Sequence, residues 1–244
     1  MKRAAIVVCT FLLTTGGLIA ANKSTMSRGT LVDSGSFSIF VNGRRVGTEQ
    51  FRIEQSQNGS VVNSEVTVED GISRAMQASE LEMGKTGNLV RYHWHEESPG
   101  KAQSTVEPSN DFLVQHISQN GTEKPQEQPY ILPPSTLVVD DYFFIHREVL
   151  AWRYLASVCE SSPAGMKCKN NRGEFGILIP RQRTSMPATI EFVGKEKINI
   201  HGTVRDLYHY TLKTEVAEMG LYLDQQNKLI RVVIEGDNTE VVRD

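Results

Sequence analysis

The sequence FSIFVNGRRVGTEQFRI, from Phe37 to Ile53, decides the fold class. Phe37, Ile39 and Val41 alternate with other residues, and such a period of two is typical of a strand that buries one face. Asn42-Gly43 follows at once, and this dipeptide is a strong signal for a tight hairpin turn. The stretch therefore predicts two antiparallel strands with a common buried face.

The same pattern recurs outward from this hairpin. Asn58-Gly59 marks a second turn, and Val62 to Val68 alternates again. Further alternating segments lie at 81–83, 90–95, 112–117, 175–179, 190–192, 198–200, 208–212, 221–223 and 230–234. We expect residues 96–110 to form a loop or an edge excursion, and residues 122–134, with their four prolines, an irregular crossover. This spacing predicts about 10–14 antiparallel strands.

One stretch breaks the alternation. Val138 to Val158 contains neither Gly nor Pro, and Asp140 is a suitable N-cap for a helix. Apolar residues fall there at helical spacing, namely Tyr142, Ile145, Val149, Trp152 and Leu155. We therefore predict a mainly β fold, α+β by strict count, over residues 34–244. It is a large curved antiparallel sheet, or a half-barrel or clam, with one main α-helix near residues 140–157.

The first residues have the pattern of a secretory signal peptide. Lys2 and Arg3 precede an uncharged, mostly apolar stretch that ends at Ala21. We expect residues 1–21 to be removed and residues 22–33 to form a flexible lead-in; cleavage after Ala20, or a retained membrane anchor, are the alternatives. No later segment is long enough to span a bilayer. The protein is therefore expected to be exported, to the periplasm or the medium.

The net charge bears on the kind of binding partner, and the cysteine content bears on disulfide bonding. The 244 residues carry a formal net charge of −3, which argues against a generally basic nucleic-acid-binding surface. Once the signal peptide is removed, Cys159 and Cys168 are the only cysteines. In an oxidising compartment we expect them to form a disulfide bond, worth about 2–3 kcal/mol. Two independent thiols are the alternative.

Two segments carry a resemblance to known proteins. One is FSIFVNGRRVGTE, from Phe37 to Glu49, and the other joins Leu221–Asp224 to Lys228–Val232. Together they resemble a group of uncharacterised exported bacterial β-rich proteins. More distantly they resemble the periplasmic lipoprotein-carrier fold, a half-open antiparallel barrel around a helix. The resemblance implies an architecture and a compartment, and it implies no catalytic residue.

His93 and His95 are the strongest metal-like pair. Alternate residues of a strand point to the same face, so both imidazoles can meet one ion. A third ligand has to come from elsewhere, and a plain polar outer face, where histidine is ordinary, explains the pair more simply. No cofactor is expected.

Other polar groups give weaker hypotheses. Asp140, Asp141 and His146 are candidates for an acid–base cluster, although helix capping explains Asp140 more simply. Arg181 and Arg183 form a small basic loop that could contact an anionic head group. Since the sequence contains no Gly-x-Ser-x-Gly, phosphate-loop or dinucleotide motif, we favour a protein that is not an enzyme.

Aromatic side chains suggest a ligand. We expect a cavity between helix and sheet to be lined by Phe143, Phe144, Trp152, Tyr92 and Trp94, with a plain core contact as the alternative. The leading hypothesis is a non-enzymatic binding or carrier protein for an apolar or amphiphilic envelope ligand such as a lipid. The alternatives are a structural or interaction module that binds an envelope protein, and a metal-dependent hydrolase using His93 and His95.

Overall fold

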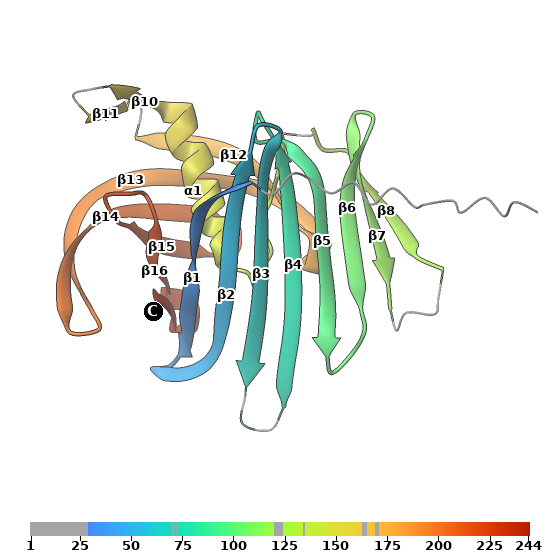
Figure 1. The fold of residues 1–244 in the computed structure, drawn as a ribbon, viewed down its shortest axis with the longest axis horizontal. Coiled ribbons are helices and arrows are strands. Elements are labelled where there is room, and N and C mark those ends of the chain that lie inside the picture. The colour runs from blue at the N-terminus through green and yellow to red at the C-terminus, as the bar shows by residue number, and fades with distance from the viewer. Residues whose placement is uncertain are drawn as a thin grey trace, which may run out of the picture.

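One large antiparallel sheet organises the molecule (Figure 1). The computed structural model describes residues 29–69, 71, 73–119, 124–133, 135–162, 165–168 and 171–244. Fifteen strands follow one another in the order β8-β7-β6-β5-β4-β3-β2-β1-β17-β16-β15-β14-β13-β12-β9. The sheet does not close, so β8 and β9 are its two edges. The proposed signal peptide lies outside the described residues.

The first half of the sheet is a simple meander in which each strand pairs with the next. Its strands are β1 (Thr30–Val41), β2 (Arg44–Ser56), β3 (Gly59–Glu69), β4 (Arg74–Gly84), β5 (Leu89–Ser98), β6 (Gln103–Ser109), β7 (Phe112–Ser118) and β8 (Gln126–Tyr130). The predicted Asn42-Gly43 turn joins β1 to β2, with positive φ at both residues. The hairpin read from the sequence is therefore confirmed.

A second meander forms the other half. Its strands are β12 (Arg172–Ile179), β13 (Thr184–Ile200), β14 (Thr203–Thr214), β15 (Glu218–Leu223), β16 (Leu229–Ile234) and β17 (Thr239–Arg243). Two short 3₁₀ helices interrupt it, η1 (Pro180–Gln182) and η2 (Glu235–Asp237). The halves join where β1 pairs antiparallel with β17, from Phe37 opposite Arg243 to Val41 opposite Thr239.

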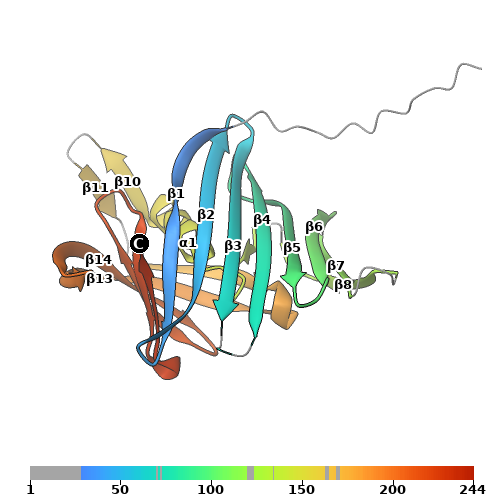
Figure 2. The ribbon, with the colours of Figure 1, turned by 60° about the horizontal axis from the view of Figure 1, so that its bottom comes forward.

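The segment between the meanders carries the helix. It contains β9 (Leu137–Val138), which pairs parallel with β12, then α1 (Ile145–Val158) and the separate hairpin of β10 (Cys159–Ser162) and β11 (Gly165–Cys168). Figures 1 and 2 show the two meanders as two walls that run crosswise to each other, with α1 between them. Within the described residues no helix is long and apolar enough to cross a membrane.

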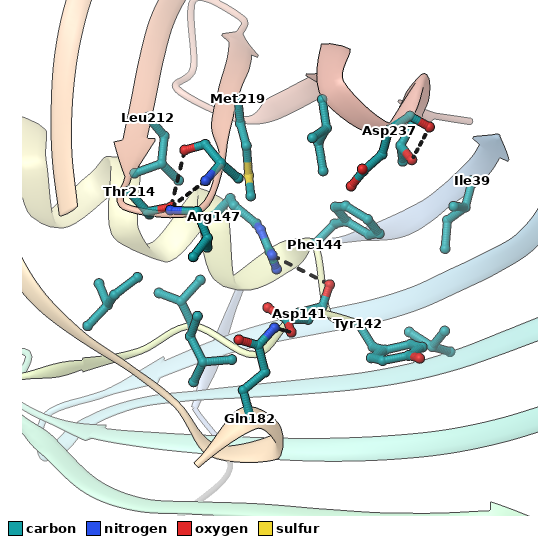
Figure 3. Close-up of a pocket in the computed structure, with 18 of the residues that line it drawn as sticks. Ile39, Asp141, Tyr142, Phe144, Arg147, Gln182, Leu212, Thr214, Met219 and Asp237 are labelled. Carbon is teal, nitrogen blue, oxygen red and sulfur yellow. Dashed lines mark hydrogen bonds between the residues drawn. The ribbon is translucent and has the colours of Figure 1, made fainter. Parts of the chain in front are cut away.

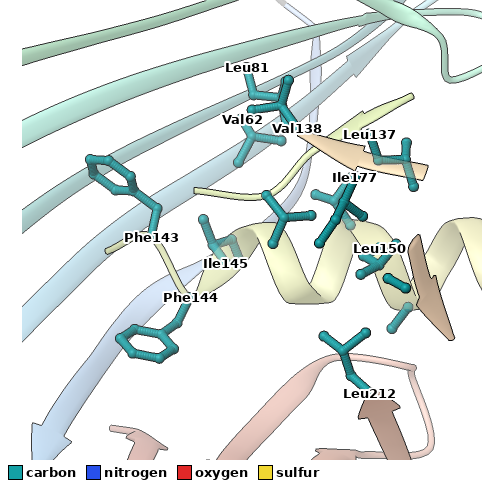
Figure 4. Packing of buried hydrophobic residues seen from close by; sticks show 14 of the residues in the cluster. Val62, Leu81, Leu137, Val138, Phe143, Phe144, Ile145, Leu150, Ile177 and Leu212 are labelled. Atoms are coloured by element: carbon teal, nitrogen blue, oxygen red, sulfur yellow. The ribbon is translucent and has the colours of Figure 1, made fainter. Parts of the chain in front are cut away.

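The main core lies between the two walls and around α1. Phe143, Ile145 and Leu150 are at most 1% exposed and pack with residues of both meanders (Figure 4). A smaller cluster lies apart from it, where Ile200 and Leu207 near the β13–β14 turn pack with side chains of β15, β16 and β17. The mainly β architecture with one helix is thus confirmed.

The structure differs from the prediction in three respects. The helix begins at Ile145 rather than near residue 140, because its cap comes from a distant strand, as described below. β1 already begins at Thr30, since the backbone of residues 30–33 pairs with the end of β2. Finally, polar residues 103–109 and 126–130 form β6 and β8, so the sheet has more strands than the 10–14 predicted. Backbone pairing forms these strands without a clear apolar alternation.

Candidate functional site

A large cavity opens between the two walls, beside the start of α1 (Figure 3). Its volume is about 590 Å³, within the range of small-molecule sites. Fourteen of its 20 lining residues are apolar or aromatic, and they come from both meanders: Ile39, Val46, Val66, Val68, Val139, Tyr142, Phe144, Ile177, Ile179, Leu212, Val216, Ala217, Met219 and Ile234. The polar lining residues are Asp141, Arg147, Gln182, Thr214, Asp237 and Thr239.

Glu49 of β2 fixes the start of α1 beside this cavity. Its carboxylate accepts hydrogen bonds from the backbone N–H groups of Phe144 (2.7 Å) and Ile145 (3.2 Å), and from the Ser64 hydroxyl (2.7 Å). The first N–H groups of a helix have no partner within the helix, so this carboxylate performs the role of an N-cap. Burial raises the pKa of Glu49 to about 7, although these hydrogen bonds act in the opposite direction.

Arg147, in the first turn of α1, is a buried cation at the cavity wall. Only 2% of it is exposed. Its Nη1 donates to the carbonyl oxygens of Asp140 (2.5 Å) and Phe143 (2.9 Å), and Nη2 to that of Asp141 (3.4 Å). Its Nε has no hydrogen-bond partner among the described residues. Among the described residues no carboxylate oxygen lies within the 4.0 Å of an ion pair with Arg147, and burial lowers its pKa.

The proposed acid–base cluster is brought together only in part. His146 Nδ1 accepts a hydrogen bond from the backbone N–H of Asp140 (3.1 Å), whereas the Asp140 carboxylate accepts from Tyr92 Oη (2.8 Å) and the N–H of Tyr142 (3.2 Å). Burial lowers the pKa of His146 to about 3, so the imidazole is neutral. Asp141 instead contacts Gln182. The contacts of Asp140 and His146 fold the loop before α1.

A second buried ionic cluster ties α1 to the seam between the meanders. Glu148 accepts a hydrogen bond from the Leu229 N–H (2.6 Å), and Arg243 binds Asp33 through two nitrogens at 2.7 and 2.9 Å. Arg243 also lies 3.6 Å from Glu148, and Lys228 lies 2.7 Å from Asp33. Arg243 thus has the carboxylate partners that Arg147 lacks.

The five aromatic residues predicted to bind a ligand do not form one site. Phe144 lines the large cavity, and Figure 4 shows Phe143 turned to the other side of the chain. Phe143 and Tyr92 are fully buried in the core. Trp152 donates from Nε1 to the Asn227 carbonyl oxygen (2.7 Å), so it binds a turn of the second meander.

Trp94 belongs to a contact that joins the two walls. The Arg181 guanidinium of η1 lies 4.8 Å from the ring centroid of Trp94 and 3.8 Å from that of Tyr142, and it also contacts Gln77. The basic loop predicted at residues 181–183 is therefore partly engaged within the molecule. Arg183, in the left-handed conformation, ends η1.

His93 and His95 lie together on the face of β5 opposite Tyr92, with ring centroids 5.5 Å apart. His93 Nδ1 lies 3.1 Å from the Thr105 hydroxyl, and His95 Nε2 lies 3.6 Å from Glu97. The described part of the chain contains no group of three His, Cys, Asp or Glu side chains arranged to bind a metal ion. The third ligand that this hypothesis requires is missing from these residues.

The two cysteines lie opposite each other. In the β10–β11 hairpin the backbone of Cys159 is paired with that of Cys168. Directly opposite residues in antiparallel strands bring their Cβ atoms close enough for a disulfide bond. The Cys168 side chain is outside the described part of the structure, so the bond itself stays a prediction.

Comparisons with protein-family models, with curated proteins and with solved structures found no match. The site therefore has to be interpreted from its own chemistry.

The sequence did not predict the roles of Glu49, which caps α1 beside the cavity, and Arg147, which lines it. Glu49 is in phase with the buried Phe51 and Ile53, so the alternation places it on the inner face, although a charged side chain is normally expected on the solvent face. Arg147 stands in the run His146-Arg147-Glu148, and all three side chains are at most 2% exposed. One signal was present: three ionisable residues inside the most apolar stretch of the domain indicate a polar cluster within the core.

Proposed function

We propose that this protein is an exported, non-enzymatic binding protein that holds an apolar or amphiphilic ligand in the large cavity. The observation that carries the proposal is the cavity itself, about 590 Å³ and lined mainly by apolar side chains from both walls. Burial of apolar ligand surface there supplies roughly 25 cal/mol per Å², less the cost of ordering the ligand. The apolar stretch at residues 4–21 supports export.

The geometry also supports a role in binding rather than catalysis. The neutral His146 is enclosed by Tyr92 and Phe143, with ring centroids 5.8 and 5.7 Å away. Glu49 accepts hydrogen bonds from three donors and is fully buried. Both groups are at most 1% exposed and neither lines the large cavity, so a ligand held there does not reach the unpartnered His146 Nε2 or the Glu49 carboxylate.

Titration with the fluorescent probe N-phenyl-1-naphthylamine tests the proposal. Met219→Trp places a larger side chain in the cavity, and we expect it to weaken probe binding by about tenfold or more. Val204→Trp is the matched control, because Val204 is 64% exposed and lies outside the cavity lining. Equal binding by both variants would contradict the cavity as the site. Absence of binding by the native protein would favour the envelope interaction module.

A further inference from the structure

Arg147 has no directly bonded counter-ion among the described residues, and this indicates the kind of ligand. A charge that is removed from water is normally paired, because the loss of hydration is costly. Arg243, whose side chain is 12% exposed, obeys this rule through its two-nitrogen contact with Asp33. Among the described residues Arg147 is in direct contact only with backbone carbonyl oxygens and the ring of Phe144, 5.1 Å away, while the carboxylates of Asp141, Glu49 and Asp140 act on it from beyond ion-pair distance. Of these two guanidinium groups, the one at the cavity is the one that has no described carboxylate in ion-pair contact.

We infer that Arg147 binds the carboxylate head group of a single-chain amphiphile whose tail lies in the large cavity. This inference rests on the proposed function and adds the chemical class of the ligand. Figure 3 shows the Arg147 side chain between Met219, Phe144 and Asp141, where polar and apolar walls meet. The head group therefore meets a cation at the same place where the tail begins to contact apolar side chains.

The free donors of Arg147 suit a carboxylate. Its Nε has no partner in the described part of the chain, and the Nη2 contact with the Asp141 carbonyl oxygen is the longest of its three, at 3.4 Å. Nε and one terminal nitrogen form a planar fork that binds the two oxygens of a carboxylate in parallel. An entering carboxylate takes the free Nε–H and replaces the weak Nη2 contact, while both bonds from Nη1 remain.

The rest of the wall favours a single negative charge. Asp141 and Asp237 also line the cavity, so a doubly charged group would meet carboxylates as well as Arg147. Apolar residues such as Ile39, Val66 and Met219 make up most of the rest of the lining and suit a hydrocarbon chain. A fatty-acid-like monoanion satisfies both conditions.

The test compares two ligands that differ only in the head group. Calorimetric titration of the protein, freed of bound lipid, with dodecanoate and with dodecanol should give about tenfold or tighter binding of the anion. In Arg147→Gln the two ligands should bind equally, at the weaker affinity. Because Arg147 also holds the loop before α1, a second variant is needed in case this one does not fold.

Asp141→Asn is that second variant. It removes a negative charge from the wall beside Arg147, and we expect dodecanoate to bind several-fold tighter while dodecanol is unaffected. Asp206→Asn, on the exposed part of β14, makes the same change in net charge and should alter neither. Equal binding of both ligands by the native protein, or no gain in Asp141→Asn, would overturn the inference and leave the cavity as an apolar site. Binding of neither ligand would refute the proposed function as well.

Discussion

Glu49→Gln tests whether burial or hydrogen bonding governs the carboxyl group that caps α1. The side chain is fully buried, and it accepts two backbone N–H bonds at the positive end of the helix. Those bonds favour the ionised form, whereas loss of hydration favours the neutral form. Glutamine keeps one acceptor oxygen and nearly the same shape, but it cannot ionise.

The expected magnitude follows from the pKa. Burial raises the pKa of Glu49 from 4.5 to about 7. A group with a higher pKa in the folded state binds its proton more tightly there, so its contribution to stability is present below pH 4.5 and is lost as the pH rises through 7. The shift corresponds to about 3 kcal/mol in the free energy of unfolding. This loss should be absent from the glutamine variant.

Urea unfolding between pH 4.5 and 8.5, followed by the fluorescence of Trp94 and Trp152, measures the effect. The native protein should lose about 3 kcal/mol relative to Glu49→Gln over this range. His146, whose pKa burial lowers to about 3, contributes a change of opposite sign that is common to both proteins and cancels in the difference. Glu65→Gln, on the exposed face of β3, controls for the loss of one carboxyl group. A difference that is flat, or that favours the native protein at high pH, would refute the reasoning.

Three further substitutions test the frame around the site. Asp33→Asn removes the buried carboxylate that Arg243 binds through two nitrogens and leaves it only the more distant Glu148, so it should lower the free energy of unfolding by about 3 kcal/mol; an unchanged urea midpoint would contradict this. Cys159→Ser should cost about 2–3 kcal/mol in the oxidised protein, and an intact mass equal to that of the fully reduced chain would exclude a bond to Cys168. Gly59→Ala places a Cβ 1.9 Å from a carbonyl oxygen of β4 at φ +147°, so the melting temperature should fall markedly, and an unchanged value would show that the β2–β3 turn can shift.

The sheet was predictable from the sequence because a period of two in apolar residues is a local signal. Asn42-Gly43 gave a turn at the correct residues, Asn58-Gly59 gave one displaced by a single residue, since Gln57-Asn58 form the turn and Gly59 begins β3, and the one break in the alternation gave the helix. The start of that helix was not predictable in the same way. Its cap is Glu49, 95 residues earlier in the chain, and Asp140 bonds to Tyr92 and its own loop instead. A cap supplied through tertiary structure leaves no mark in the local sequence.

The sequence predicted the kind of site, a cavity, but not most of the residues that line it. A cavity between helix and sheet was expected, and Phe144 does line it. The other four aromatic residues are absent from its lining, because bulky aromatic side chains fill a core as readily as they line a cavity. The cavity is formed instead by Ile, Val, Leu and Met residues from strands far apart in sequence. Composition alone cannot distinguish these residues from the rest of a β core.

The pairing of β1 with β17 sets an order on the folding of the chain. Strands β1 to β8 can pair successively as they are synthesised, since each lies beside its sequence neighbour. The outer edge of β1, however, stays open until Thr239–Arg243 has been made. Contacts between such distant segments form slowly, and an open strand edge meanwhile invites association with other chains. A helper that shields this edge until β17 is available should therefore raise the yield of the folded protein.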